Sequence, residues 1–158
     1  MNETRGKRYS ETAKQYLGKV RVLERRINVT ADELEHIHAL RTKITSTLKE
    51  CTIMSSGGGD RRNDATVTLI ELEEKLNDLM SQYAKTIEQT NRAIDCLYSE
   101  RQHDLMCRRY ILGHSFQRIA KDMSIELDSV YKLHGRALWK IGQWIEINNE
   151  ATQRGKTG

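Results

Sequence analysis

The sequence predicts an all-α fold, in which a long antiparallel coiled-coil hairpin is followed by a compact set of shorter helices. The 158-residue chain contains no proline, which favours long and uninterrupted helices. Its apolar residues recur at steps of three and four over two long stretches, as they do in coiled coils. A glycine-rich segment at residues 55–60 separates the two stretches and predicts the turn of the hairpin.

The first stretch predicts a helix over residues 8–50. Its apolar positions alternate between spacings of four and three residues: Tyr9, Ala13, Tyr16, Val20, Leu23 and Ile27. The same register continues to Leu48, with polar interruptions at Thr30 and Arg41. Thr30 and Glu33 also have the spacing of a capping box, a motif that starts helices. One continuous helix is the favoured prediction, and two shorter helices that meet near residues 29–30 are the alternative.

The second stretch predicts another long helix, which extends from the glycines to about residue 98. Its apolar register includes Leu69, Leu72, Leu76, Leu79, Tyr83, Ile87, Ile94 and Leu97. Residues 8–98 thus form a hairpin in which the second helix folds back on the first. Two helices leave part of each apolar stripe uncovered, so we expect this arm to self-associate, with a homodimer favoured. The glycine segment lacks the lysine and the preceding strand of a phosphate-binding loop, so we interpret it as a connector.

Charged residues divide the chain into three parts. Residues 1–62 contain 13 Lys and Arg against 8 Asp and Glu, residues 63–98 contain 3 against 7, and residues 99–158 contain 10 against 7. An acidic surface repels phosphate. Contacts with nucleic acid are therefore expected only in the two basic parts.

The remaining composition indicates a cytoplasmic protein. No stretch of the chain approaches the roughly 18 apolar residues that a membrane-spanning helix needs, and residues 1–10 lack the apolar core of a signal peptide. The three cysteines form no CxxC pair, which is typical of a reducing compartment. No contact with a membrane is expected.

After Ser99 the pattern changes to shorter helices, which we interpret as a separate domain at residues 99–147, followed by a polar tail at 148–158. Three helices are predicted, over residues 99–113, 115–123 and 127–145. Ser99 and Gln102 have the spacing of a capping box, and the first helix ends at a glycine. Ser115 is the predicted N-cap of the second helix.

The second and third of these helices have the residue spacing of a helix-turn-helix. Apolar residues occupy the positions that this motif buries: Phe116, Ile119, Met123, Ile125, Val130 and Leu133. Ala120 supplies the small residue that is needed where the two helices cross. Ser124 occupies the turn, where glycine is the usual residue. The residues of the third helix that we expect to face the core are Val130, Leu133, Ala137 and Ile141.

The same C-terminal residues resemble region 4 of bacterial sigma factors. The similarity lies in Leu105–Ala120 and Val130–Leu138. The chain resembles more closely, over residues 13–145, the small phage regulators of the RinA and ArpU type, which also have a stretch like Thr42–Thr47, a glycine-rich turn and an acidic, leucine-rich helix. The resemblance implies a sequence-specific DNA-binding protein that regulates phage transcription. It implies an activator of late genes that acts with host RNA polymerase in the bacterial cytoplasm.

Two other functions remain open from the sequence. Small terminases, the DNA-packaging recognition subunits of phages, also join a helix-turn-helix to an oligomerising coiled coil. A sigma-like fold can also serve as a protein-docking module on RNA polymerase. An oligomer of ring size favours the first alternative, and polymerase binding without DNA reading favours the second.

Double-stranded DNA is the expected ligand, and the third helix carries most of the expected contacts. By analogy with sigma region 4, base edges are read by Leu127, Asp128 and Lys132. Lysine donates to guanine, aspartate accepts from cytosine, and leucine contacts a thymine methyl group. The residues assigned to phosphate contacts, or to the same face, are Arg118, Ser129, Tyr131, Arg136 and Lys140.

Nothing in the sequence predicts an enzyme, a cofactor or a metal site. His103 and Cys107 have the i, i+4 spacing of a shared ligand pair, and Cys96 is nearby, but no fourth ligand follows a metal-binding pattern. No Ser/His/Asp or paired-carboxylate arrangement is recognisable. Trp139 and Trp144 are interpreted as packing residues of the last helix.

Overall fold

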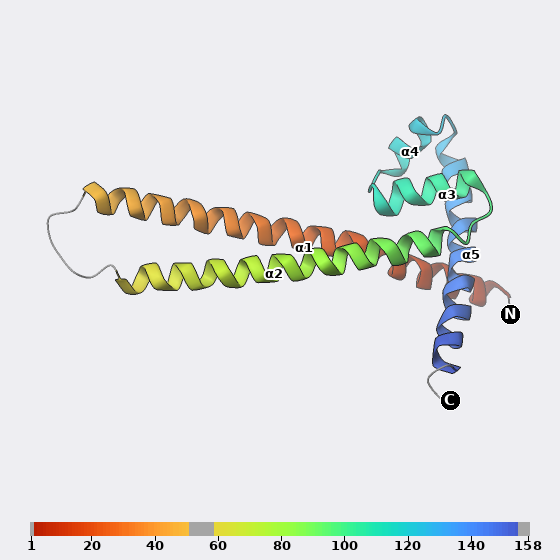
Figure 1. Cartoon of the computed structure of the whole chain (residues 1–158). Coiled ribbons are helices and arrows are strands. Elements are labelled where there is room, and N and C mark those ends of the chain that lie inside the picture. Colours follow the sequence, from red (N-terminus) through yellow and green to blue (C-terminus); the bar gives the residue numbers. More distant parts are fainter. Residues whose placement is uncertain (1, 51–58, 155–158) are drawn as a thin grey trace. The chain divides into compact units, whose positions relative to one another are not determined.

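The computed structural model describes residues 2–50 and 59–154 and shows an all-helical protein (Figure 1). Its elements are α1 (Asn2–Glu50), α2 (Gly59–Ile94), α3 (Glu100–Met106), the π-helix η1 (Cys107–Ile111), α4 (Phe116–Asp122) and α5 (Leu127–Arg154). Within the two described ranges there is no strand, so the all-α prediction is confirmed. Residues 55–58 of the predicted glycine turn lie outside the described residues. None of the described helices is long and apolar enough to cross a lipid bilayer.

Both long helices predicted from the heptad pattern are present. α1 passes through residues 29–30 without interruption, so the one-helix prediction is confirmed and the two-helix alternative is wrong. Thr30 is buried, at 2 % exposure, in the middle of this helix. A capping box stabilises a helix only at its N-terminus. Thr30 and Glu33 lie in the middle of α1, so their spacing marks no helix boundary here. α1 also begins earlier than the predicted residue 8, at Asn2.

The chain forms two compact units. The helix-pair unit is residues 23–83, and the terminal unit combines residues 1–22 with residues 84–158. This grouping differs from the expected boundary after residue 98, because the first turns of α1 and the last turns of α2 pack with the C-terminal helices. The terminal unit contains 18 Lys and Arg against 11 Asp and Glu, whereas the helix-pair unit contains 8 against 11. The basic excess of the chain therefore belongs to the terminal unit.

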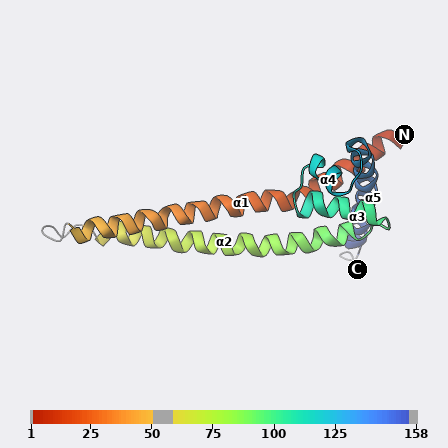
Figure 2. The same ribbon diagram turned by 90° about the horizontal axis from the view of Figure 1, so that it is seen from above.

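In the helix-pair unit, segments of α1 and α2 lie side by side (Figure 2). Leu69 and Leu79 are almost fully buried, at 4 % and 2 % exposure, as the heptad pattern predicts. Lys75 Nζ lies 3.9 Å from Glu33 Oε2 in an exposed ion pair between the helices. Several large apolar side chains remain exposed on this unit: Val29, Leu40, Ile44, Val67, Ile70 and Met80. Two helices alone cannot cover every side of their apolar stripes.

The terminal unit has one apolar core, to which all of its helices contribute. The buried members are Ala13, Leu17, Ala93, Ile94, Leu97, Leu105, Met106, Tyr110, Ile119, Val130, Ala137, Leu138, Ile141 and Ile145. The core-facing prediction for α5 is confirmed, since Val130, Ala137 and Ile141 are fully buried and Leu133 packs against them in part. Trp144 also packs against this core, as predicted.

The first turns of α1 pack directly against α5. A Cβ atom on Gly142 would lie 2.2 Å from the backbone oxygen of Tyr9, so only glycine permits this approach. Beside this contact, Tyr9 meets the Trp139 ring edge-on, with ring centroids 6.4 Å apart, and Arg8 forms an ion pair with Glu146. Trp139 thus packs in part, as predicted, but it keeps 43 % exposure. These contacts hold the beginning of α1 along the middle of α5.

α3 continues into one turn of π-helix before the chain leaves the helix. The N–H of Leu112 donates to the carbonyl of Cys107 at 3.0 Å, which is the i to i−5 bond of a π turn. The chain then turns at Gly113, whose φ of 69° confirms the predicted helix end. The predicted capping box at Ser99 is wrong, because the Ser99 side chain makes no capping bond. Gln102 is instead buried and bonds to α5.

α5 buries a histidine against η1 and α4. His134 Nε2 lies 3.1 Å from the Tyr110 hydroxyl, and the two rings stack with centroids 5.9 Å apart. The Phe116 ring meets His134 edge-on at 4.9 Å. Burial, together with the nearby charges of Arg109 and Lys14, lowers the pKa of His134 to about 4. Burial also raises the pKa of Tyr110 to about 12, so both groups are neutral in the fold near neutral pH.

We expect the fold to lose stability in mild acid through His134. Its pKa is about 4 in the folded chain and 6.5 in an unfolded one, so its contribution to the unfolding free energy is complete above pH 6.5 and is lost as the pH falls towards 4. A pKa difference of this size corresponds to about 3 kcal/mol. Urea unfolding across this pH range measures the loss. His134→Gln does not titrate and should lose less stability; equal losses in both proteins would contradict the assignment.

We expect Gly142→Ala to destabilise the chain by about 1–3 kcal/mol, the usual cost of overpacking, because the added methyl group meets the α1 backbone. Gly135→Ala is the matched control on the same helix. A Cβ atom there meets nothing within 4 Å, so alanine should stabilise the helix by about 1 kcal/mol. Thermal unfolding followed by circular dichroism measures both changes. The close contact between α1 and α5 is disproved if the two substitutions act alike.

Candidate nucleic-acid interface

A tight turn with defined hydrogen bonds connects α4 to α5. The Ile125 N–H donates to the Ala120 carbonyl at 3.0 Å, and the Ser124 N–H donates to the Lys121 carbonyl at 3.2 Å. These are the two bonds of a Schellman motif. Ser124 has a φ of 53°, the left-handed conformation that glycine usually supplies at this position. The predicted turn at Ser124 is therefore confirmed.

The helices on either side of this turn bury the residues that the spacing indicates. Ile119 and Val130 are fully buried. The other apolar positions pack in part against the same core: Phe116, Ala120, Met123, Ile125 and Leu133. At the start of α4, the Ser115 hydroxyl accepts a hydrogen bond from the Arg118 N–H at 3.2 Å, as predicted for the N-cap. Core packing and this cap together fix the orientation of α4 and of the first turns of α5.

The outer face of α5 carries most of the residues predicted to contact DNA. The exposed members of the predicted set are Arg118, Asp128, Ser129, Tyr131, Lys132 and Arg136. The half-buried members are Leu127 and Lys140. Because Asp128, Lys132 and Arg136 follow one another at intervals of four, they lie along one side of the helix. The structure therefore brings the residues of α5 together on one face, whereas Arg118 lies on the neighbouring helix α4.

Some of these side chains have partners within the protein. Lys132 Nζ lies 2.7 Å from Asp128 Oδ2, in an ion pair whose side chains are 67 % and 72 % exposed. The two charged residues predicted to read bases thus neutralise each other at the surface. Lys140 Nζ donates to Gln102 Oε1 at 3.4 Å. Arg136 forms no hydrogen bond or ion pair with another described residue, so its charge is the least compensated on this face.

Phe116 supports the aromatic residue of this face. The ring centroids of Phe116 and Tyr131 lie 5.0 Å apart, and the Arg109 guanidinium lies over the Phe116 ring at 4.3 Å. Arg109 Nη1 also donates to the His114 carbonyl at 3.0 Å. Tyr131 is therefore packed on one side, and it keeps 48 % exposure on the other.

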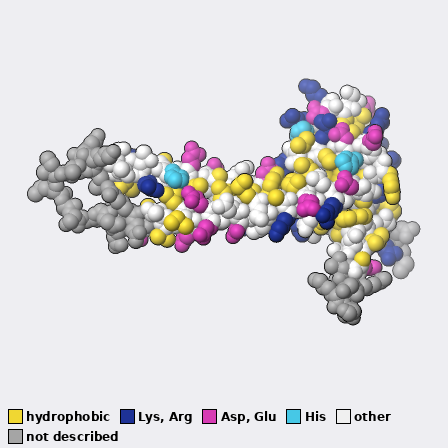
Figure 3. All heavy atoms as spheres, viewed as in Figure 1, with side chains coloured by type: hydrophobic (Ala, Val, Ile, Leu, Met, Phe, Trp, Pro, Cys, Tyr) yellow, Lys and Arg dark blue, Asp and Glu magenta, His cyan; other side chains and the backbone are white. Residues whose placement is uncertain are grey.

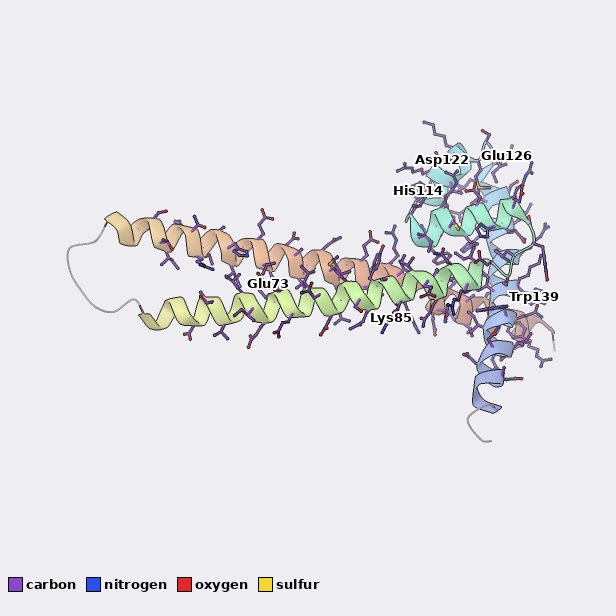
Figure 4. All side chains as sticks on the ribbon, in the orientation of Figure 1. Glu73, Lys85, His114, Asp122, Glu126 and Trp139 are labelled. Atoms are coloured by element: carbon purple, nitrogen blue, oxygen red, sulfur yellow. The ribbon has the colours of Figure 1, made fainter. Side chains whose placement is uncertain are left out.

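A polar cluster around Asp122 is not predicted from the sequence. Asp122 Oδ2 lies 3.2 Å from Arg108 Nη1, 3.5 Å from His114 Nδ1 and 3.7 Å from Arg118 Nε. Figure 4 shows His114 and Asp122 together beside α4, and Figure 3 shows Lys and Arg side chains gathered over the same region. The i, i+4 spacing of Arg118 and Asp122 is the one sequence signal for this cluster. The charge that Arg118 offers to a ligand is thus partly neutralised.

The histidine and cysteine singled out from the sequence belong to a separate polar cluster. His103 Nε2 lies 3.0 Å from Asp95 Oδ1, and Cys107 Sγ lies 3.7 Å from His103 Nδ1. Burial raises the pKa of the Cys107 and Cys96 thiols, which favours their protonated form. In the part of the chain that the structure describes, no three His, Cys, Asp or Glu side chains are grouped to hold a metal ion.

Comparison with known proteins does not assign the chain to a family. The resemblance to phage regulators and to sigma region 4 therefore rests on the residues and spacings given above. No family model matches the chain, and neither a curated protein nor a solved structure matches it at a significant level.

Proposed function

We propose that the chain is a sequence-specific DNA-binding regulator of transcription, and that α5 is the helix that enters the major groove. One observation carries the proposal: a Schellman turn at Ser124 joins two helices that bury their apolar positions and expose Asp128, Lys132 and Arg136 on one face. In helix-turn-helix proteins, the N-terminal part of the second helix reads base edges and the flanking residues contact the backbone. The fit to this pattern supports binding to double-stranded DNA.

The ion pair between Asp128 and Lys132 gives this face a defined way to discriminate sequences. In the free protein the pair holds both side chains at the surface. An exposed pair within one helix is worth only about 0.3–0.5 kcal/mol, so DNA can open it at little cost. Lys132 then donates to guanine and Asp128 accepts from cytosine. A sequence that offers neither partner leaves Asp128 facing phosphates, which repel it.

The resemblance to sigma region 4 supports transcription as the process that uses this binding. In this proposal the protein activates phage late genes together with host RNA polymerase. The exposed apolar residues of the helix-pair unit support self-association through that unit, with a dimer favoured. A two-fold dimer carries two copies of α5 and binds two half-sites at a spacing fixed by the protein.

Selection of duplexes from a library with a randomised central region tests the proposal. We expect the full chain to enrich one short motif. Lys132→Ala should bind that motif more weakly by about 1–3 kcal/mol. Replacing the base pair that Lys132 recognises should then cause no further loss of affinity in the variant. Lys85→Ala, which removes an exposed lysine of α2 (Figure 4), is the matched control. Enrichment of no motif would contradict sequence-specific binding.

Asp128→Asn should affect specificity and affinity in opposite directions. Removing the carboxylate releases Lys132 and eliminates repulsion from phosphates, so we expect tighter binding to duplex of mixed sequence. The preference for the selected motif should decrease, because the cytosine acceptor is lost. The ratio of the two dissociation constants, measured at one salt concentration, reports both effects. A variant that binds mixed-sequence DNA no more tightly than the wild type would rule out the proposed role of Asp128.

Two further measurements, combined with the duplex selection, separate the two alternative functions. A ring-sized oligomer, measured by light scattering, together with a motif located among packaging genes would indicate a DNA-packaging subunit. Capture of RNA polymerase by a Lys132→Ala/Arg136→Ala variant, with no motif enriched by the wild type, would indicate a docking module.

A further inference from the structure

A second basic surface lies beside the outer face of α5, within the terminal unit. An open groove with a volume of about 970 Å³ runs between the first turns of α1 and the middle of α5. Lys7 and Lys14 line it from α1, and Arg136, Trp139 and Lys140 line it from α5. Trp139 marks its position in Figure 4. The sequence predicts DNA contacts for Arg136 and Lys140 but none for the lysines of α1.

The groove has an excess of positive charge that the protein does not compensate. Its charged lining residues are Lys7, Lys14, Arg136, Lys140 and Glu11. Lys7, Lys14 and Arg136 form no hydrogen bond or ion pair with another described residue. Glu11, the one acidic residue in the lining, accepts a hydrogen bond from Gln15 on its own helix at 3.2 Å. Cations that face one groove without partners make it attractive to an extended anion.

The spacing of the cations fits a chain of phosphates better than a single anion. Lys7 and Lys14 are two helical turns apart on α1, a separation of about 10 Å along the helix axis. Lysine side chains at this separation can extend to successive phosphates of one strand, whereas a single phosphate would require both side chains to bend towards each other. The half-exposed Trp139 adds an indole N–H, which can donate to a phosphate, and a flat face, which can pack on a sugar.

We propose that this groove binds the sugar–phosphate backbone of duplex DNA, so that the first turns of α1 form a second DNA-contacting element beside α5. The inference rests on the proposed function, because it takes DNA on α5 as given. Arg136 and Lys140 belong to both surfaces, so a strand that leaves the outer face of α5 continues directly into the groove. An acidic protein segment would find the same charges, but this continuity with the α5 face favours DNA.

The test is the salt dependence of DNA binding by a Lys7→Gln/Lys14→Gln double variant of the full chain. Each lost phosphate contact lowers the slope of log K against log salt concentration by about 0.9. We expect the double variant to bind a fluorescent duplex of mixed sequence more weakly, with a slope smaller by about 1.8. Glutamine keeps the helix propensity of lysine, and circular dichroism verifies that the variant is folded.

A control variant with the same change in charge separates contact from general attraction. Lys19→Gln/Lys85→Gln removes two exposed lysines of α1 and α2 that do not line the groove. Its slope should stay at the wild-type value. A second readout needs no substitution: duplex DNA should protect Lys7 and Lys14 from acetylation, measured by mass spectrometry, and should leave Lys19 and Lys85 reactive.

The outcomes distinguish this inference from the proposed function. Normal duplex binding by the wild type, with equal slopes for the groove and control variants and no protection of Lys7 and Lys14, overturns the groove inference and leaves α5 as the DNA-binding helix. Loss of binding to poly-L-glutamate by the groove variant, with duplex binding unchanged, also overturns it and assigns the groove to an acidic protein. Failure of the wild type to bind duplex at all overturns both proposals.

Discussion

Burial of one face of α5 is the constraint on which the core and the proposed interface both depend. Leu138 and Ile141 are almost completely buried, and they share the core with residues from distant parts of the sequence, among them Leu17 of α1 and Ile94 of α2. A close-packed core admits few alternative arrangements, so fixing the inner face of a helix also fixes the direction of its outer face. The direction of the Lys132 side chain is therefore set by both ends of the chain. Any change that loosens the first turns of α1 will also disturb the orientation of the proposed interface on α5.

The sequence predicts those parts of the fold that depend on local hydrogen bonding or on periodicity. The sequence predicts a helix end or turn at Gly113, Ser115 and Ser124, and the local geometry confirms each of them. Helix ends and turns are predictable because they are determined by a few adjacent residues. The capping-box pattern at Thr30 was misleading, since its spacing also occurs by chance inside a helix. The contact of α1 with α5 is beyond this kind of reasoning: periodicity identifies which face of α1 is buried, but not the partner that buries it.

The same division applies to the candidate interface. The exposure of the outer face of α5 follows from its helical period, and the i, i+4 spacing of Asp128 and Lys132 is sufficient to predict their pairing. The cluster at Asp122 and the groove beside Trp139 require the tertiary fold, because their members come from separate helices. The burial of His134 is the clearest example of a feature that the sequence does not predict. A histidine looks like a surface residue in the sequence, and only its ring contacts with η1 and α4 explain why it is buried.

The π turn of η1 restricts the sequence in a different way, through the number of residues rather than their identity. Each helical residue advances the rotation of the chain by about 100°, and a π turn holds one residue more than an α-helical turn. Because the π turn absorbs its extra residue within one turn, deleting one residue between Cys107 and Ile111 would restore regular helical bonding and leave α3 in nearly the same rotation. A further inserted residue that is not absorbed in this way would rotate α3 by about 100° relative to the segment that follows. Leu105 and Met106, both at 0 % exposure, would then leave the core. Evolutionary relatives of this chain should therefore tolerate the loss of one residue between Cys107 and Ile111 more readily than the gain of one.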